Sequence, residues 1–118
     1  QNMARFNHVS INVQLLDLNK DADKIRSNHY HLIIMCRFLD RNLFSQIRHW
    51  LAPGGFFVCE TFSENAAKFG KPRKKSLLLK DGELLRLFSD WENSGEINRR
   101  LSDGRPMTGF FCQKPTKS

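Results

Sequence analysis

Histidines are the residues most often used in catalysis and metal binding, and their spacing in this chain suits neither role. The chain has four of them, at His8, His29, His31 and His49. None stands in a Ser/His/Asp arrangement or at the separation of metal ligands along a helix or turn. We therefore assign no catalytic base to a histidine.

Cysteines offer a second route to chemistry. The chain has three, at Cys36, Cys59 and Cys112. No Cys-x-x-Cys motif is present, so we expect no metal site. Each cysteine stands in an apolar, strand-like run, which predicts buried thiols in a reducing compartment.

A basic run, KFGKPRKK at residues 68–75, gives a third possibility. Its cations are Lys68, Lys71, Arg73, Lys74 and Lys75. They make up much of the formal net charge of +7, and such a run can bind nucleic-acid phosphates. The alternative is a solvent-exposed loop. Few aromatic residues lie among these charges, so we do not expect a stacking platform for single strands.

The composition defines the setting for these residues. The 118 residues are 40% hydrophobic and 26% charged, which suits one folded domain. The longest apolar stretch, residues 32–36, is far below the ~20 residues needed to cross a bilayer. We exclude a membrane protein, a secreted disulfide scaffold and a fibrous repeat. We expect a cytoplasmic or other reducing intracellular location, with flexible ends at residues 1–10 and 116–118.

The middle of the chain predicts a β-α-β unit. The continuous apolar run of residues 30–38, YHLIIMCRF, is typical of a central strand buried on both faces. Residues 41–51 form an amphipathic helix that Asp40 or Asn42 can cap and that Pro53 and the following glycines end. Residues 56–62 form the next buried strand. Such a unit is almost always parallel and right-handed.

The flanking segments complete an α/β sheet. We predict a short strand over residues 11–16 and a helix over residues 82–91, capped by Asp81 and with Glu83 in its first turn. Residues 96–101 and 107–114, joined by a turn, predict a hairpin. The expected fold is mostly parallel, with an antiparallel strand pair at the C-terminal side.

These residues resemble the C-terminal half of a class I S-adenosylmethionine-dependent methyltransferase. The segment YHLIIMCRFLDRNLFSQIRHWLAPGGFFVCETF has the family's aromatic-x-Leu-Ile-Ile strand, short helix, Leu-x-Pro-Gly-Gly turn and aromatic-rich strand. It is most similar to the small tellurite-resistance-type methyltransferases, through Arg37-Phe38-Leu39 and the Phe-Gly-x-Pro-Arg stretch before a Leu-rich helix. The resemblance covers roughly residues 11–115. It implies a Rossmann-like sheet and methyl transfer from S-adenosylmethionine to a small or soft nucleophile.

One part of the family pattern is missing. The family holds its cofactor through a glycine-rich loop after the first strand and an acidic residue after the second. No Gly-x-Gly precedes residues 11–18, and the only adjacent glycines, Gly54 and Gly55, lie in a later turn. The resemblance implies that the chain begins near the third strand. We expect the chain alone to bind S-adenosylmethionine weakly or not at all, and to be inactive.

The resemblance also implies cofactor-binding residues at two strand ends. The Asp17 side chain would contact the adenine amino group, and the Leu18 backbone N–H would meet a ring nitrogen. Cys36, Arg37 and Phe38 end the central strand, where open α/β sheets bind ligands. Arg37 would face the cofactor carboxylate or an anionic substrate.

Glu60 and Thr61 end the neighbouring strand and are our candidates for the substrate side. A second interpretation of Glu60 is a structural ion pair with a nearby lysine or arginine.

Two other functions remain open. The chain could be a non-catalytic methyltransferase-like module for interaction or structure, or a nucleic-acid-associated protein acting through its basic loop. In the family strand order, residues 31–36 would lie beside the missing first strand and leave an unpaired edge. We therefore expect self-association or a companion chain that completes the sheet.

Overall fold

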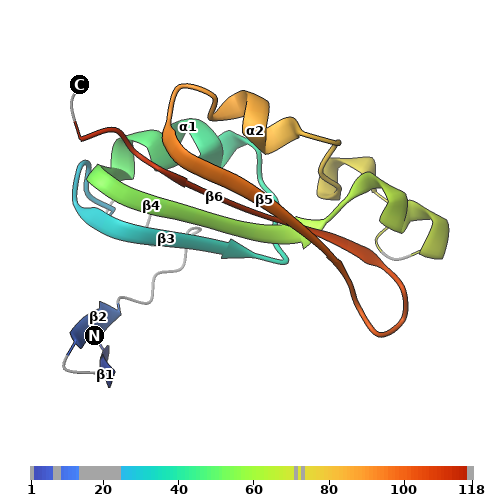
Figure 1. The fold of residues 1–118 in the computed structure, drawn as a ribbon, viewed down its shortest axis with the longest axis horizontal. Coiled ribbons are helices and arrows are strands. Elements are labelled where there is room, and N and C mark those ends of the chain that lie inside the picture. The colour runs from blue at the N-terminus through green and yellow to red at the C-terminus, as the bar shows by residue number, and fades with distance from the viewer. Residues whose placement is uncertain (1, 7–8, 14–24, 71, 73, 117–118) are drawn as a thin grey trace.

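The computed structural model describes residues 2–6, 9–13, 25–70, 72 and 74–116. Its centre is a four-stranded sheet in the order β3 (Tyr30–Cys36), β4 (Leu51–Phe62), β6 (Pro106–Gln113) and β5 (Glu92–Arg100). Two α-helices, α1 (Asn42–Trp50) and α2 (Glu83–Leu87), lie on the same side of this sheet (Figure 1). The predicted α/β class is confirmed, and the main sheet is open and mixed, with both parallel and antiparallel strand pairs. None of the described helices is long and apolar enough to cross a membrane.

The N-terminal strand differs from the prediction. Strand β2 (Val9–Val13) pairs antiparallel with β1 (Asn2–Phe6), in a separate two-stranded sheet. We expected a strand over residues 11–16 that belonged to the main sheet, and no regular structure before residue 11. Strand β1 supplies the backbone hydrogen-bond partners of β2, so β2 does not need a partner strand from the main sheet. The rest of the predicted strand lies outside the described residues.

The predicted β-α-β unit is confirmed. Strands β3 and β4 run parallel, with residue pairs from Tyr30↔Leu51 to Cys36↔Glu60. Helix α1 connects them and buries its apolar face. The predicted caps, Asp40 and Asn42, are wrong for the N-cap position, which Arg41 occupies without a side-chain capping bond. Asp40 lies one residue earlier, and its carboxylate accepts a hydrogen bond from the Asn42 backbone N–H at 3.0 Å.

The turn after α1 depends on its glycines. Gly54 has a φ of +84°, a conformation that favours glycine. A Cβ at Gly55 would lie 2.9 Å from the carbonyl oxygen of Ala52 and 3.0 Å from that of Tyr30. The Pro-Gly-Gly motif therefore brings β3 and β4 close together at the start of their pairing.

The predicted C-terminal hairpin is also confirmed. Strands β5 and β6 are antiparallel, and β6 inserts between β5 and β4. Gly104, with a φ of +91°, lies in their connecting turn, where the Asp103 carboxylate accepts a hydrogen bond from the Arg105 backbone N–H at 3.1 Å. The sheet is thus parallel at one end and antiparallel at the other.

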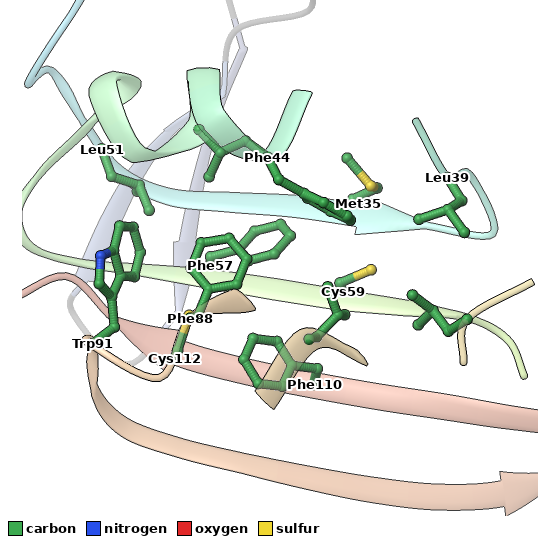
Figure 2. Close-up of a cluster of buried hydrophobic side chains, with 13 residues drawn as sticks. Met35, Leu39, Phe44, Leu51, Phe57, Cys59, Phe88, Trp91, Phe110 and Cys112 are labelled. Carbon is green, nitrogen blue, oxygen red and sulfur yellow. The ribbon is translucent and has the colours of Figure 1, made fainter. Parts of the chain in front are cut away.

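A cluster of aromatic rings joins the sheet to the helices (Figure 2). Phe57 of β4 lies 5.3 Å from Phe88, centroid to centroid, and 6.2 Å from Phe44 of α1. Phe88 also packs on Trp91 at 5.0 Å and on Phe110 of β6 at 5.9 Å. Since aromatic side chains bury the most apolar area, this cluster is the centre of the core.

The opposite face of β3 contradicts the prediction of a strand buried on both faces. Met35 is buried, but Leu32 is 52% exposed and Ile34 is 63% exposed. Cys36 is exposed as well, so the prediction of three buried thiols is wrong for this residue. Strand β3 lies at the edge of the sheet, and among the described residues no helix covers this second face.

Helix α2 begins differently from the prediction. It starts at Glu83, and Gly82, with a φ of +69°, occupies the capping position expected for Asp81. Two short 3-10 helices, η2 (Glu64–Phe69) and η3 (Lys75–Leu77), lead to it. The helix is five residues long because Phe88 takes a non-helical conformation on its way into the core.

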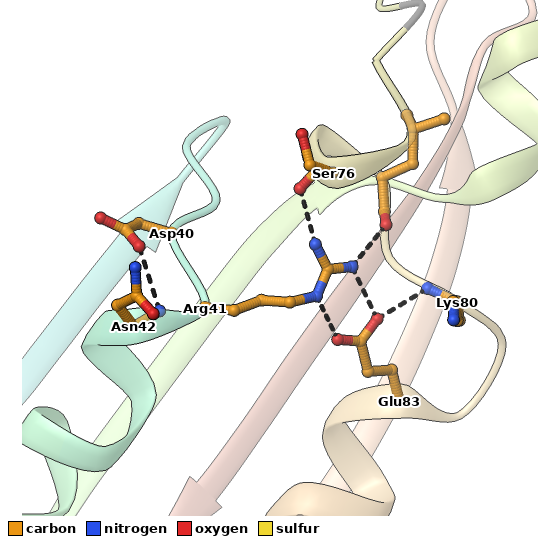
Figure 3. A network of polar contacts seen from close by, with 7 residues as sticks. Asp40, Arg41, Asn42, Ser76, Lys80 and Glu83 are labelled. Atoms are coloured by element: carbon orange, nitrogen blue, oxygen red, sulfur yellow. Dashed lines mark hydrogen bonds and ion pairs between the residues drawn. The ribbon is translucent and has the colours of Figure 1, made fainter.

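An ion pair between the two helices fixes the start of α2 (Figure 3). The Arg41 guanidinium donates to both Glu83 carboxylate oxygens, at 2.6 and 2.9 Å. The same guanidinium donates to the backbone oxygens of Ser76 and Leu78, and the Lys80 N–H donates to Glu83. Hydrogen bonding from Arg41 lowers the pKa of Glu83. The bonds therefore connect α1, η3 and α2.

The one-sided core predicts unequal costs for two truncations. Phe57→Ala removes a fully buried ring and should reduce the free energy of unfolding by about 3–5 kcal/mol. Ile34→Ala, on the open face, should cost less than about 1 kcal/mol in the single chain. Urea unfolding of both variants, at a dilution where the chain is a monomer, measures this difference. Equal losses at that dilution would show that the second face of β3 is covered within the chain.

The Arg41–Glu83 pair predicts a dependence of stability on pH. Because the pKa of Glu83 is lowered by folding, its contribution is present at neutral pH and is lost as the pH falls below about 4.5. Glu83→Gln should cost about 1–2 kcal/mol at pH 7 and flatten the acid limb of the stability curve. The control is Asp90→Asn, which alters the exposed Arg48–Asp90 pair and should change stability less. Identical pH curves for Glu83→Gln and the unmodified chain would contradict this assignment.

Candidate functional site

The carboxyl ends of β3 and β4 lie side by side and form the candidate site. Cys36, the last residue of β3, pairs in register with Glu60 of β4. Directly afterwards, the Arg37 backbone N–H donates to the Glu60 carbonyl oxygen at 2.7 Å. The structure therefore brings together three of the predicted residues, Cys36, Arg37 and Glu60.

Arg37 has a strained backbone at this edge. Its φ is +52°, and the only other non-glycine residues described with a positive φ are Asn28 and Asn93. Asparagine enters this conformation readily, whereas arginine does so at a cost of roughly 1–2 kcal/mol. Strained residues of this kind cluster at functional sites, so the backbone conformation supports Arg37 as a candidate site residue.

The strained turn presents two side chains to solvent. Arg37 is exposed, and within the described residues its guanidinium makes no hydrogen bond. Phe38 is 49% exposed, while Leu39 is buried and anchors the turn in the core. An available cation next to an exposed aromatic ring can bind a carboxylate attached to a flat or apolar group.

Glu60 is already paired. Both of its carboxylate oxygens accept hydrogen bonds from the Arg99 guanidinium, each at 2.7 Å. These bonds lower the pKa of Glu60, and the charges of Arg99 and Arg37 act in the same direction. Of the two interpretations of Glu60, the structural ion pair is confirmed.

The strand between the two partners of this ion pair has a glycine opposite Glu60. Glu60 on β4 and Arg99 on β5 are separated by β6, where Gly109 pairs with Glu60. A Cβ at Gly109 would lie 3.8 Å from the Glu60 Oε2 atom. Sequence reasoning named neither Arg99 nor Gly109 as part of the site. The register places Ile97 across from Glu60, with Gly109 between them, and Arg99 lies two residues further along β5 on the same face.

Thr61 does not share the site with Glu60. It is 2% exposed, and alternation along β4 directs it to the helix-covered face. Cys59 and Cys112 are on that same buried face, where burial raises the pKa of each thiol to about 12. These two thiols are therefore unreactive at neutral pH.

The other predicted site residues are scattered or undescribed. Asp17 and Leu18 lie outside the described residues, as do Lys71 and Arg73. Lys68 and Lys74 are exposed, and the Lys75 side chain is not described. Binding of nucleic acid by this loop stays a prediction. Across the described residues, no group of three or more His, Cys, Asp or Glu side chains could hold a metal ion.

Comparison with known proteins adds no relative. No protein-family model matches the chain, and the search of curated proteins found no match.

The strained turn predicts an unusual gain in stability. Arg37→Gly should raise the free energy of unfolding by about 0.5–1 kcal/mol, because glycine accepts a positive φ without steric cost. Arg37→Ala, which removes the same side chain but keeps the strain, should give no gain. Thermal unfolding of the two variants provides the comparison. A loss of stability in both would mean that the Arg37 side chain, and not its backbone, determines the effect.

Proposed function

We propose that this chain is the C-terminal portion of a class I S-adenosylmethionine-dependent methyltransferase fold, with methyl transfer to a small or soft nucleophile as its chemistry. The observation that carries the proposal is the exposed Arg37–Phe38 turn at the carboxyl end of β3. A parallel β-α-β unit followed by an antiparallel pair, the arrangement of strands expected from the resemblance, supports it. We also propose that the main sheet is part of a Rossmann-like sheet.

The described residues fit one part of this cofactor. The Arg37 guanidinium is available for the carboxylate of the methionine portion, and Phe38 offers an apolar surface beside it. Glu60 is not our candidate for binding the ribose hydroxyls, because each of its carboxylate oxygens already accepts a hydrogen bond from Arg99. The described residues include no glycine-rich loop of the kind through which the family holds this cofactor, and we therefore expect weak binding by this chain alone.

Methyl transfer makes modest demands on the protein. The cofactor, when bound, supplies an activated methyl group on a sulfonium sulfur. The reaction is an in-line displacement, so the protein contributes mainly by orienting the two reactants. An acid–base pair is not strictly required for such a displacement.

The proposal is tested by titrating the chain with S-adenosylmethionine and following backbone amides by NMR. We expect shifts confined to residues 36–38 and 60, with a dissociation constant weaker than the low micromolar range. The second ligand is 5′-methylthioadenosine, which lacks the carboxylate. Arg37→Ala should weaken S-adenosylmethionine several-fold and leave 5′-methylthioadenosine unchanged.

The matched control is Arg26→Ala, which removes an exposed arginine before β3, at the other end of the strand. It should alter the binding of neither ligand. Equal losses in Arg26→Ala and Arg37→Ala would indicate general charge attraction and contradict the proposed site. Low micromolar binding that is independent of Arg37 would also contradict it.

A further inference from the structure

The second face of the main sheet is apolar and open. Alternation places one set of side chains from all four strands on the face opposite α1 and α2. We define the open face by six of its apolar members, Leu32, Ile34, Phe56, Val58, Ile97 and Phe111. Five of them are between 38% and 63% exposed, and Val58 is half-buried. The register continues to Phe62 and Met107, where Arg105 lies over Phe62 and Met107 is buried.

The members of the open face form one patch, because the registers connect them. Leu32 pairs with Phe56, and Ile34 pairs with Val58, which pairs in turn with Phe111. Phe111 extends across Gly95 of β5, where an added Cβ would lie 2.4 Å from the ring. The ring therefore continues the apolar surface toward Ile97. Other exposed leucines, such as Leu87 on α2, lie on the helices and outside this patch.

The open face is as large as the apolar patches that often serve binding. The exposed fractions correspond to on the order of 500 Å² of apolar side chain, comparable to the largest patch on an ordinary monomer. Two such faces in contact would bury on the order of 1,000 Å² from these side chains alone, the area that a specific interface requires.

The charges on the open face are compatible with a second copy. Despite the net charge of +7, the described charges of this face are balanced: Glu60 pairs with Arg99, and Arg105, which lies over Phe62, pairs with Asp103. The register also places Glu92 on this face, through Gln113 and Phe56. Other described cations lie away from this face, for example Lys68 on η2 and Arg86 on α2. Bringing two open faces together therefore creates little like-charge repulsion.

We propose that the open face is an interface with a second copy of this chain, packed sheet against sheet. Two twisted sheets in contact interdigitate their inner side chains across about 10 Å. The same patch serves both copies, so the assembly closes at two. The free edge of β3 is not needed for this contact. The interface thus differs from the strand-to-strand pairing that an unpaired edge suggests.

The test is sedimentation equilibrium of the full chain and three variants. The unmodified chain should be dimeric at tens of micromolar. Ile34→Glu on β3 and Ile97→Glu on β5 should each raise the dimer dissociation constant roughly tenfold or more, because both bury a charge in an apolar interface. Both residues are 63% exposed in the single chain, so the monomer should fold, which circular dichroism will check.

The matched control is Leu87→Glu, which introduces the same charge at a 44% exposed leucine on α2 and should leave the dimer intact. A monomer at 100 µM would overturn the proposal. Assemblies that grow beyond two copies would overturn it as well. Loss of the dimer in Ile34→Glu but not in Ile97→Glu would indicate pairing through the β3 edge and would also reject face-to-face packing.

Discussion

The contact of Phe57 with Phe88 decides how this chain is organised. Phe57 projects from the central strand β4, and Phe88 closes the short helix α2 over it. Phe44 and Phe110 complete the cluster from α1 and β6. Arg48 stacks on the Phe88 ring at 4.8 Å and pairs with Asp90, which covers the cluster from outside. All of this apolar burial falls on one face of the sheet, and it leaves the other face without a cover.

The elements that were predicted well are those specified by local pattern. The helix at α1 has a 3.6-residue apolar period, the Pro-Gly-Gly turn has a positive φ at Gly54, and the C-terminal hairpin has glycine in its turn. The burial of β3 was predicted wrongly for a physical reason. A continuous apolar run shows that apolar side chains point to both faces of a strand. It does not show that both faces have partners, which only tertiary contacts determine.

Only part of the candidate site was predicted, because tertiary contacts determine the rest. Strand ends can be located from sequence, so Arg37 and Glu60 were placed correctly at neighbouring carboxyl ends. The Arg99 partner of Glu60 could not be identified from sequence, because the pairing depends on the registers of β4, β6 and β5. The positive φ of Arg37 also has no local signal. It follows from its hydrogen bond to β4 and the burial of Leu39.

The open face and the candidate site share a border. Alternation along β3 and β4 places Cys36 and Glu60 on the same face as Ile34 and Val58. A partner that packs on the apolar part of this face therefore ends next to the Arg37 turn. Such a partner restricts the directions from which a ligand can reach Arg37. The two features nevertheless depend on different groups. The patch needs apolar area at Ile34 and Ile97, whereas the turn offers a cation beyond the end of β3. Ile97→Glu, on the edge strand far from the turn, should therefore weaken the packing of a partner on the open face. The same substitution leaves Arg37 and Phe38 in place to contact a ligand.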